Sequence, residues 1–173
     1  MKLRATLHLN DQPANLTIFT GLQETWEHLV LKLAASLFFF ESHPTIEMGA
    51  THPALQGQEY YPDLFNADLT NQPTLWVECG KTTLHKLEKI SKRFRQARVI
   101  VLTPFPHQAR QQAEGIEEEG LRVSVWSFAD GEFERWKNLV QEKNEIIGEA
   151  SETALNLVIN EQSFMTELQK ILP

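Results

Sequence analysis

The chain has only one cysteine among its 173 residues, Cys79, and this excludes an internal disulfide. A single thiol suits a reducing compartment, so we expect a cytoplasmic location. The eight glycines are scattered and form no glycine-rich phosphate loop, neither GxGxxG nor GxxxxGK followed by Ser or Thr. The six histidines show no spacing typical of a zinc site.

Long apolar runs are also missing. The longest, residues 29–40, is interrupted by Lys32 and Ser36 and is too short to span a bilayer. Residues 1–10 alternate apolar and polar side chains and lack the apolar core of a signal peptide. We therefore expect no membrane partner.

The chain has fewer basic than acidic residues: 16 Lys and Arg against 23 Asp and Glu, which gives a net charge of −7. Proteins that coat nucleic acid normally carry the opposite sign, since Lys and Arg must replace phosphate counterions. A local basic strip remains compatible with this balance. The helix expected after Gly80 carries one: Lys86, Lys89, Lys92, Arg93 and Arg95. This face is either a solvated helix surface or a strip that contacts a nucleic-acid backbone.

The composition, with 42% hydrophobic and 23% charged residues, is ordinary for a globular protein, and we expect a single domain over residues 1–173. Alternation with period 2, apolar runs and turn residues predict strands at 3–9, 15–20, 74–79, 98–102 and 121–126, a short one at 46–48, and a C-terminal hairpin at 145–150 and 153–159. Helical spacing predicts helices at 24–40, after Gly80, at 107–119 and at 132–140. Residues 161–172 fit either a helix or a strand. The alternation of strands and helices between residues 74 and 126 indicates parallel strands with crossovers.

Acidic side chains gather around the strand expected at 74–79. Asp63 and Asp68 precede it and Glu78 lies at its end, followed by Gly80 and Lys81. Two carboxylates at about 4 Å repel by about 4 kcal/mol at an effective dielectric of about 20, and a divalent cation relieves this repulsion. Acids with a lysine nearby are the parts that hold a metal against a phosphodiester. Alternatively, both aspartates make local hydrogen bonds in a turn, and Glu78 pairs with Lys or Arg.

These residues carry a resemblance to the YaeQ family of small bacterial proteins. The shared motifs are Leu3-Arg4-Ala5-Thr6, Glu24-Thr25-x-Glu27, Pro62-Asp63-Leu64, Asp68-Leu69-Thr70 and Leu75-Trp76-Val77-Glu78-x-Gly80, and the match extends to Val123-Ser124-Val125-Trp126. The resemblance implies an α/β fold with a central mixed β-sheet flanked by helices, similar to the PD-(D/E)XK (restriction-endonuclease-like) phosphodiesterases. It further implies that Asp63 or Asp68 is the first acid and Glu78 the second, and that Glu27 supports a metal-bound water.

The lysine departs from that pattern. It is usually the second residue after the second acid, and Gly80 stands there. Lys81 comes one residue late, and in an extended strand it would point to the opposite face unless Gly80 bends the chain. The resemblance implies that Lys86 or Lys89, on the following helix, takes its place.

The resemblance therefore predicts a metal-dependent phosphodiesterase or nuclease-like protein. Asp63, Asp68 and Glu78 would hold Mg²⁺ or Mn²⁺, Glu27 would support the site, and Lys86 or Lys89 would supply positive charge. A second hypothesis keeps the fold without the catalysis, as a module that binds a protein partner or, weakly, nucleic acid. The displaced lysine and the acidic charge favour this second hypothesis. A small-molecule enzyme is a third possibility, for which no residue indicates a substrate.

Overall fold

The computed structural model describes residues 1–47, 49 and 51–173. Within these residues ten strands form a single mixed sheet: β1 (Lys2–Leu9), β2 (Gln12–Phe19), β3 (Thr45–Ile46), β4 (Leu64–Ala67), β5 (Pro73–Cys79), β6 (Arg98–Thr103), β7 (Ser124–Phe128), β8 (Lys143–Ala150), β9 (Ala154–Ile159) and β10 (Gln162–Leu172). The same residues form four α-helices: α1 (Trp26–Phe38), α2 (Leu84–Arg93), α3 (Pro106–Glu118) and α4 (Glu132–Leu139). None of the described helices is long and apolar enough to cross a membrane.

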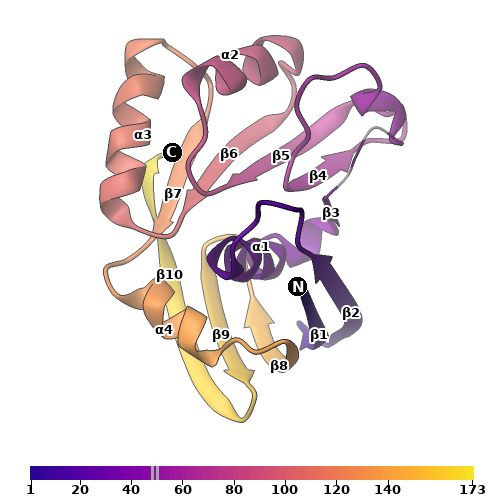
Figure 1. Ribbon diagram of the computed structural model, residues 1–173, viewed down its shortest axis with the longest axis vertical. Coiled ribbons are helices and arrows are strands. Elements are labelled where there is room, and N and C mark those ends of the chain that lie inside the picture. The colour runs from indigo at the N-terminus through magenta and orange to yellow at the C-terminus, as the bar shows by residue number, and fades with distance from the viewer. Residues whose placement is uncertain (48, 50) are drawn as a thin grey trace.

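The sheet has the order β2-β1-β8-β9-β10-β7-β6-β5-β4-β3 and curls around α1 into a nearly closed, barrel-like shape (Figure 1). Every residue of α1 from Leu29 to Phe38 is buried, so the helix lies inside the curl and does not flank it. A helix that is buried on all sides must be apolar on nearly all sides, and the run 29–40 meets this requirement. The expected α/β class with a mixed sheet is confirmed, and the position of α1 differs from the flanking arrangement that we expected.

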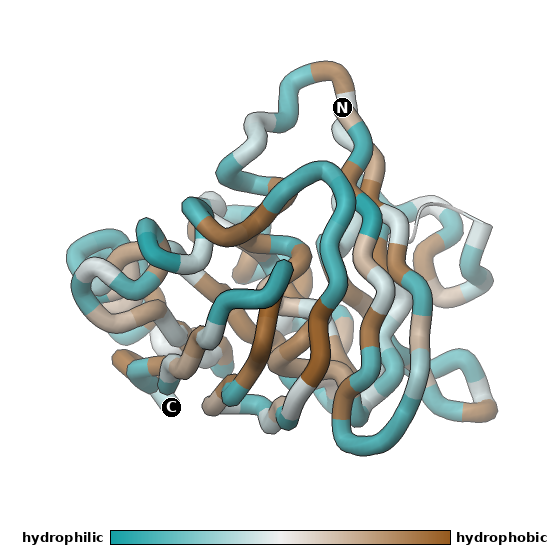
Figure 2. The backbone as a smooth tube through the Cα atoms, turned by 90° about the horizontal axis from the view of Figure 1, so that it is seen from below, coloured by the Kyte–Doolittle hydropathy of each residue, from teal (hydrophilic) through white to brown (hydrophobic). Residues whose placement is uncertain are grey.

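Two cores lie on opposite sides of β5. The inner core surrounds α1 and includes Leu75 and Val77, whereas the outer core lies under α2 and α3 and includes Trp76. Because side chains alternate along a strand, Glu78 shares the outer side with Trp76. Figure 2 shows the hydrophobic segments running through the middle of the molecule, with hydrophilic residues in the connecting loops.

The pairing confirms the main topological predictions. Strands β5, β6 and β7 are parallel neighbours joined by α2 and α3. The N-terminal β1–β2 hairpin and the C-terminal β8–β9 hairpin are antiparallel. Residues 161–172, which fit two predictions, contain strand β10, antiparallel to β9 and to β7. The parallel pairing of β1 with β8 joins the N-terminal hairpin to the C-terminal strands.

Four short segments differ from the prediction. Strand β2 begins at Gln12, three residues before the expected start at residue 15, because its pairing with β1 extends to Leu9. Strand β4 was not expected, because four residues are too few for a period-2 pattern and its pairing with β5 defines it. Strand β7 begins at Ser124, so residues 121–123 precede it. The short strand predicted at 46–48 begins earlier, with β3 at Thr45–Ile46, and residue 48 lies outside the described residues.

Candidate functional site

Asp63 lies at the junction between α1 and the end of β5. Its backbone N–H donates to the Val77 carbonyl at 3.1 Å, and its Oδ2 accepts from the Cys79 N–H at 2.8 Å. Its Oδ1 faces α1, at 3.2 Å from His28 Nε2 and 3.3 Å from Lys32 Nζ. Burial opposes ionisation of this carboxyl, but the His28 and Cys79 hydrogen bonds and the Lys32 charge hold its pKa below the usual range. Asp63 is therefore a carboxylate at neutral pH.

Lys32 brings three carboxylates together. Its ammonium, only 3% exposed, forms ion pairs with Glu24, with Glu47 at 2.8 Å and with Asp63 at 3.3 Å. Burial favours the neutral amine, yet these carboxylates raise the pKa of Lys32 well above its ordinary value. We call Glu24, His28, Lys32, Glu47 and Asp63 the Lys32 cluster. The Lys32 ammonium and the three carboxylates together carry two negative charges.

Three members of the cluster have the geometry of metal ligands. One ligand atom each from Glu24, His28 and Asp63 lie within 4.8 Å of one another. Carboxylate oxygens are ligands for Mg²⁺ and Mn²⁺, and the imidazole suits transition metals. The donor set therefore fits a divalent cation, and among the two metals that the sequence suggested it favours Mn²⁺.

Glu78 and Lys86 form a second charged pair on the outer side of β5. The Glu78 side chain is buried, with Oε1 accepting from Trp76 Nε1 and Oε2 from Lys86 Nζ, both at 2.6 Å. Burial raises the pKa of Glu78 and the nearby charge of Asp63 adds to this rise, while Lys86 and the Trp76 hydrogen bond act against it. Glu78 directly precedes Cys79, whose N–H donates to Asp63, so the two acids lie at the same end of β5.

The turn after β5 places Lys86 beside Glu78. Gly80 has φ +90°, a left-handed conformation that glycine adopts easily, and it bends the chain away from the sheet. Thr83 then caps α2 by accepting from the Lys86 N–H at 3.2 Å. Lys86 therefore lies in the first turn of a helix that starts at the end of the acidic strand, while Lys81 is exposed.

Three predicted site residues make their contacts elsewhere. Asp68 is exposed in a turn, where its Oδ1 accepts from the N–H and hydroxyl of Thr70 and from the Gln72 N–H, which together lower its pKa. Glu27 is exposed and pairs with Lys137 at 2.9 Å. Lys89 is exposed and pairs with Glu59 at 2.6 Å. Their catalytic roles stay predictions, and these contacts do not bring them into the Lys32 cluster or the Glu78–Lys86 pair.

Four residues of the Lys32 cluster were not predicted as site residues. Glu24, His28 and Lys32 are spaced by four, so they lie near one face of α1 and its start, and this spacing was a usable signal. Glu47 gave no local signal. It is brought to the cluster by long-range backbone pairing, in which its N–H donates to the Asp63 carbonyl at 2.8 Å.

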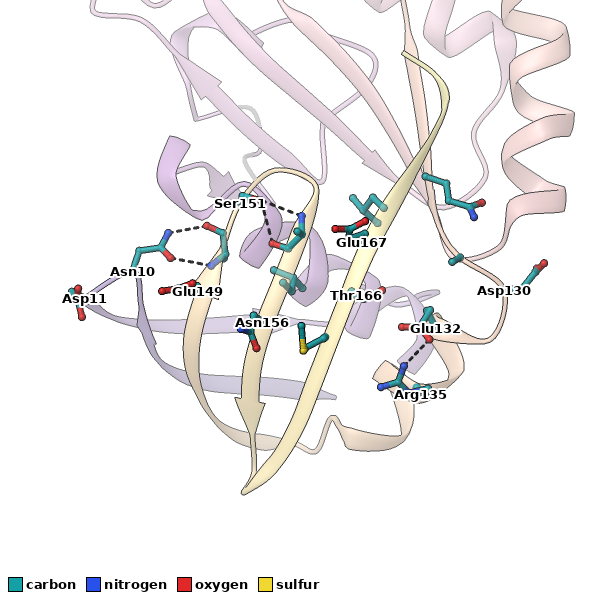
Figure 3. A pocket seen from close by; sticks show the side chains of 17 residues that line it. Asn10, Asp11, Asp130, Glu132, Arg135, Glu149, Ser151, Asn156, Thr166 and Glu167 are labelled. Atoms are coloured by element: carbon teal, nitrogen blue, oxygen red, sulfur yellow. Dashed lines mark hydrogen bonds and ion pairs between the residues drawn. The ribbon is translucent and has the colours of Figure 1, made fainter.

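The most voluminous of the described cavities, about 1060 Å³, lies away from both groups, across β8, β9 and β10 toward the start of α4 (Figure 3). Its lining contains the acids Asp11, Asp130, Glu132, Glu149 and Glu167 and one base, Arg135, which pairs with Glu132 at 2.6 Å. Five acids and one base give a net charge of −4, which repels a phosphate backbone. This cavity is therefore a poor place for an anionic substrate.

Comparison with known proteins identifies relatives of the whole chain. The YaeQ protein family matches residues 10–168. The crystal structure of the YaeQ protein from Xanthomonas axonopodis pv. citri superposes with a TM-score of 0.70 at 18% identity, covering 98% of this chain and 97% of that chain. The YaeQ protein from Pseudomonas syringae superposes with a TM-score of 0.72 at 16% identity, covering 99% and 94%. No curated protein matches the chain. The predicted resemblance is thus confirmed at the family level, and the chain belongs to the YaeQ family.

Proposed function

We propose that the Lys32 cluster and the Glu78–Lys86 pair together form the centre of a metal-dependent phosphodiester hydrolase of the PD-(D/E)XK type. The observation that carries this proposal is the uncompensated charge of the cluster. Two negative charges remain beside three ligand atoms within 4.8 Å of one another. A divalent cation carries a charge of the same magnitude and the opposite sign.

Asp63, Glu24 and His28 are the residues that would hold the cation. Once bound, it would supply Lewis-acid stabilisation of the negative charge that develops on a phosphodiester. Glu24 thereby takes the supporting role that the sequence suggested for Glu27. Asp68 and Lys89 are not needed in this arrangement, since their contacts lie elsewhere.

Glu78 and Lys86 would handle protons and charge beside the cation. A buried carboxyl with a raised pKa can hold a proton and pass it to a leaving oxygen. The Lys86 ammonium lies 2.6 Å from Glu78 and can turn toward a phosphoryl oxygen when the substrate arrives. Both residues were predicted as catalytic from the sequence, and their direct contact supports a shared role.

Metal binding tests the proposal directly. Wild-type protein should bind millimolar Mn²⁺, followed by electron paramagnetic resonance or calorimetry, and should cleave nucleic acid only when the metal is present. Asp63→Asn should lose both properties, because it replaces a charged carboxylate ligand by a neutral, weaker amide ligand. Asp68→Asn is the matched control, since this exposed aspartate takes part in neither group, and it should retain both.

The outcomes separate the two functions that the sequence suggested. Equal Mn²⁺ affinity in wild type and Asp63→Asn, or no binding by either, would overturn the metal site. Metal binding without cleavage of any nucleic acid would instead support the second hypothesis, a binding or regulatory module that keeps the fold.

A further inference from the structure

A smaller cavity, about 480 Å³, lies beside the Glu78–Lys86 pair, between the segment 57–60 and α2. Its volume is within the range of small-molecule sites. Three aromatic residues line it, of which Trp76 is fully buried and stacks on Phe94 with the ring centroids 5.5 Å apart and the planes at 26°. The half-buried Tyr60 is the third. Tyr60 and Phe94 are half-buried and can each present a ring face to a ligand, whereas Trp76 backs Phe94 from the core. Partly exposed rings of this kind are surfaces on which a nucleobase stacks.

The cavity also offers a polar group without a partner. Gln58 lines it, and the buried Nε2 of this side chain has no hydrogen-bond partner among the described residues. A buried donor without an acceptor costs free energy, and a ligand that supplies the acceptor recovers it. Ring nitrogens and carbonyl oxygens on the edge of a base are acceptors of this type.

The charge of this cavity is opposite to that of the protein. Lys89, Lys92 and Arg93 line it together with one acid, Glu59, which gives a net charge of +2 on a chain of net −7. Lys89 pairs with Glu59 and Lys92 with Glu88, each at 2.6 Å, but all four side chains are exposed. Exposed ion pairs are weak and screened by salt, so a phosphate can replace the carboxylates.

Two contacts connect the cavity to the candidate catalytic residues. Trp76, which lines the cavity, donates its indole N–H to Glu78 at 2.6 Å. The Lys86 ammonium, which pairs with Glu78, lies 5.6 Å from the centre of the Tyr60 ring. A base in the cavity would therefore have its adjoining phosphate close to Glu78 and Lys86.

We propose that this cavity binds an unpaired nucleobase of a single-stranded nucleic acid; the role of the adjoining phosphodiester as the cleaved bond rests on the proposed function. The rings of Tyr60 and Phe94 hold the face of the base, and Gln58 binds its edge. Lys89, Lys92 and Arg93 bind one of the two phosphates that flank the base, and the other lies toward Glu78 and Lys86. A base in a duplex is stacked and paired, so it must first leave the helix to enter.

The test compares ligands that differ only in the base. AMP and ribose 5-phosphate are titrated against the wild-type chain in EDTA, with calorimetry or saturation-transfer NMR as the readout. AMP should bind at least about fivefold more tightly, since stacking on an aromatic ring is worth that much or more. Tyr60→Ala and Gln58→Ala should each reduce this preference. Lys143→Ala, which removes an exposed basic residue outside both the lining and the basic strip, is the matched control and should leave the preference unchanged.

Strand state is the second measurement. A short adenylate single strand should compete with AMP, and the same strand annealed to its complement should compete more weakly. Equal binding of AMP and ribose 5-phosphate would overturn the proposal, as would an unchanged preference in a folded Tyr60→Ala variant. Because these titrations contain no metal, base binding without cleavage leaves the inference intact and refutes only the proposed hydrolase. Metal-dependent cleavage without any preference for AMP would refute this inference and leave the proposed hydrolase intact.

Discussion

Replacing Lys32 by methionine removes the ammonium that holds Glu24, Glu47 and Asp63 together, and it tests the charge balance of the site. Methionine nearly preserves the apolar stem, so the main change is the loss of one charge. The three carboxylates would then repel one another without any cation between them. The loss is expected to be large because Lys32 is 3% exposed while its partners are only partly solvated.

The magnitude follows from the burial of the pair. Removing one partner of a buried ion pair costs about 3–5 kcal/mol, and the partial exposure of the three carboxylates places this case near the lower end, about 3 kcal/mol. For a chain of this length, each kcal/mol shifts the melting temperature by about 2–4 °C, so the variant should melt about 6–12 °C below wild type at neutral pH.

The pH dependence has a definite sign. The pKa values of Glu24 and Asp63 are lowered in the fold, so their ion pairs stabilise wild type above the unfolded pKa values, and this stabilisation is lost as the pH falls through the folded ones. The difference in melting temperature between wild type and Lys32→Met should therefore become smaller below about pH 4. If the cluster binds cations, Mn²⁺ should also narrow the gap at neutral pH, because the ion replaces the missing charge.

Thermal denaturation followed by circular dichroism, in EDTA and in Mn²⁺, measures the loss of stability at neutral pH and its decrease in acid and in Mn²⁺. Lys137→Met is the control, because Lys137 forms pairs with the exposed Glu27 and Glu134, and its loss should cost less than about 1 kcal/mol. Equal melting temperatures for wild type and Lys32→Met at neutral pH, or a gap that does not change in acid, would refute the electrostatic account of this cluster.

Two further predictions concern single residues. Gly148→Ala should destabilise the protein by more than about 3 kcal/mol in urea denaturation, because Gly148 has φ +147° and a Cβ there would lie 2.2 Å from the Asn156 carbonyl oxygen. Gly115→Ala should cost less, since its Cβ would meet only the flexible Leu84 side chain, and equal costs would contradict this reasoning. Glu78→Gln should gain stability relative to wild type as the pH rises from about 4 toward neutral, because the raised pKa of Glu78 means that its ionisation destabilises the fold there. A constant difference in melting temperature across this pH range would argue against that pKa shift.

Local patterns in the sequence were sufficient for most elements of the fold and for part of the site. The apolar run at 74–77 predicted β5 with Glu78 at its end, and Gly80 marked the start of the turn before α2. The strand and the turn are properties of neighbouring residues. The choice of Lys86 or Lys89 came from the family resemblance, and the contact with Glu78 belongs to Lys86. The curl of the sheet around α1 could not be predicted in this way, because it depends on the pairing of β1 with β8, which are far apart in sequence.

The acidic residues likewise depend partly on local sequence and partly on long-range pairing. Asp63 and Asp68 occupy similar turn-rich sequence, and only the pairing of Asp63 with β5 turns its carboxylate toward α1. Asp68 instead satisfies its oxygen with Thr70 and Gln72, as short-range hydrogen bonding allows. Successive residues of α1 are rotated by about 100°, which separates Glu27 from His28 and Lys32. Whether Glu24 or Glu27 joins the cluster therefore depended on which side of the helix faces Asp63, and the sequence alone does not give this.

The parallel pairing of β1 with β8 has a consequence for synthesis on the ribosome. Residues 2–9 leave the ribosome well before residues 143–150, and one edge of β1 gains its partner only when the later segment has emerged. At typical translation speeds this interval is on the order of 10 s, during which the nascent hairpin exposes unpaired backbone groups. Slow translation or a stalled ribosome would prolong that exposure and so favour mispairing between nascent chains.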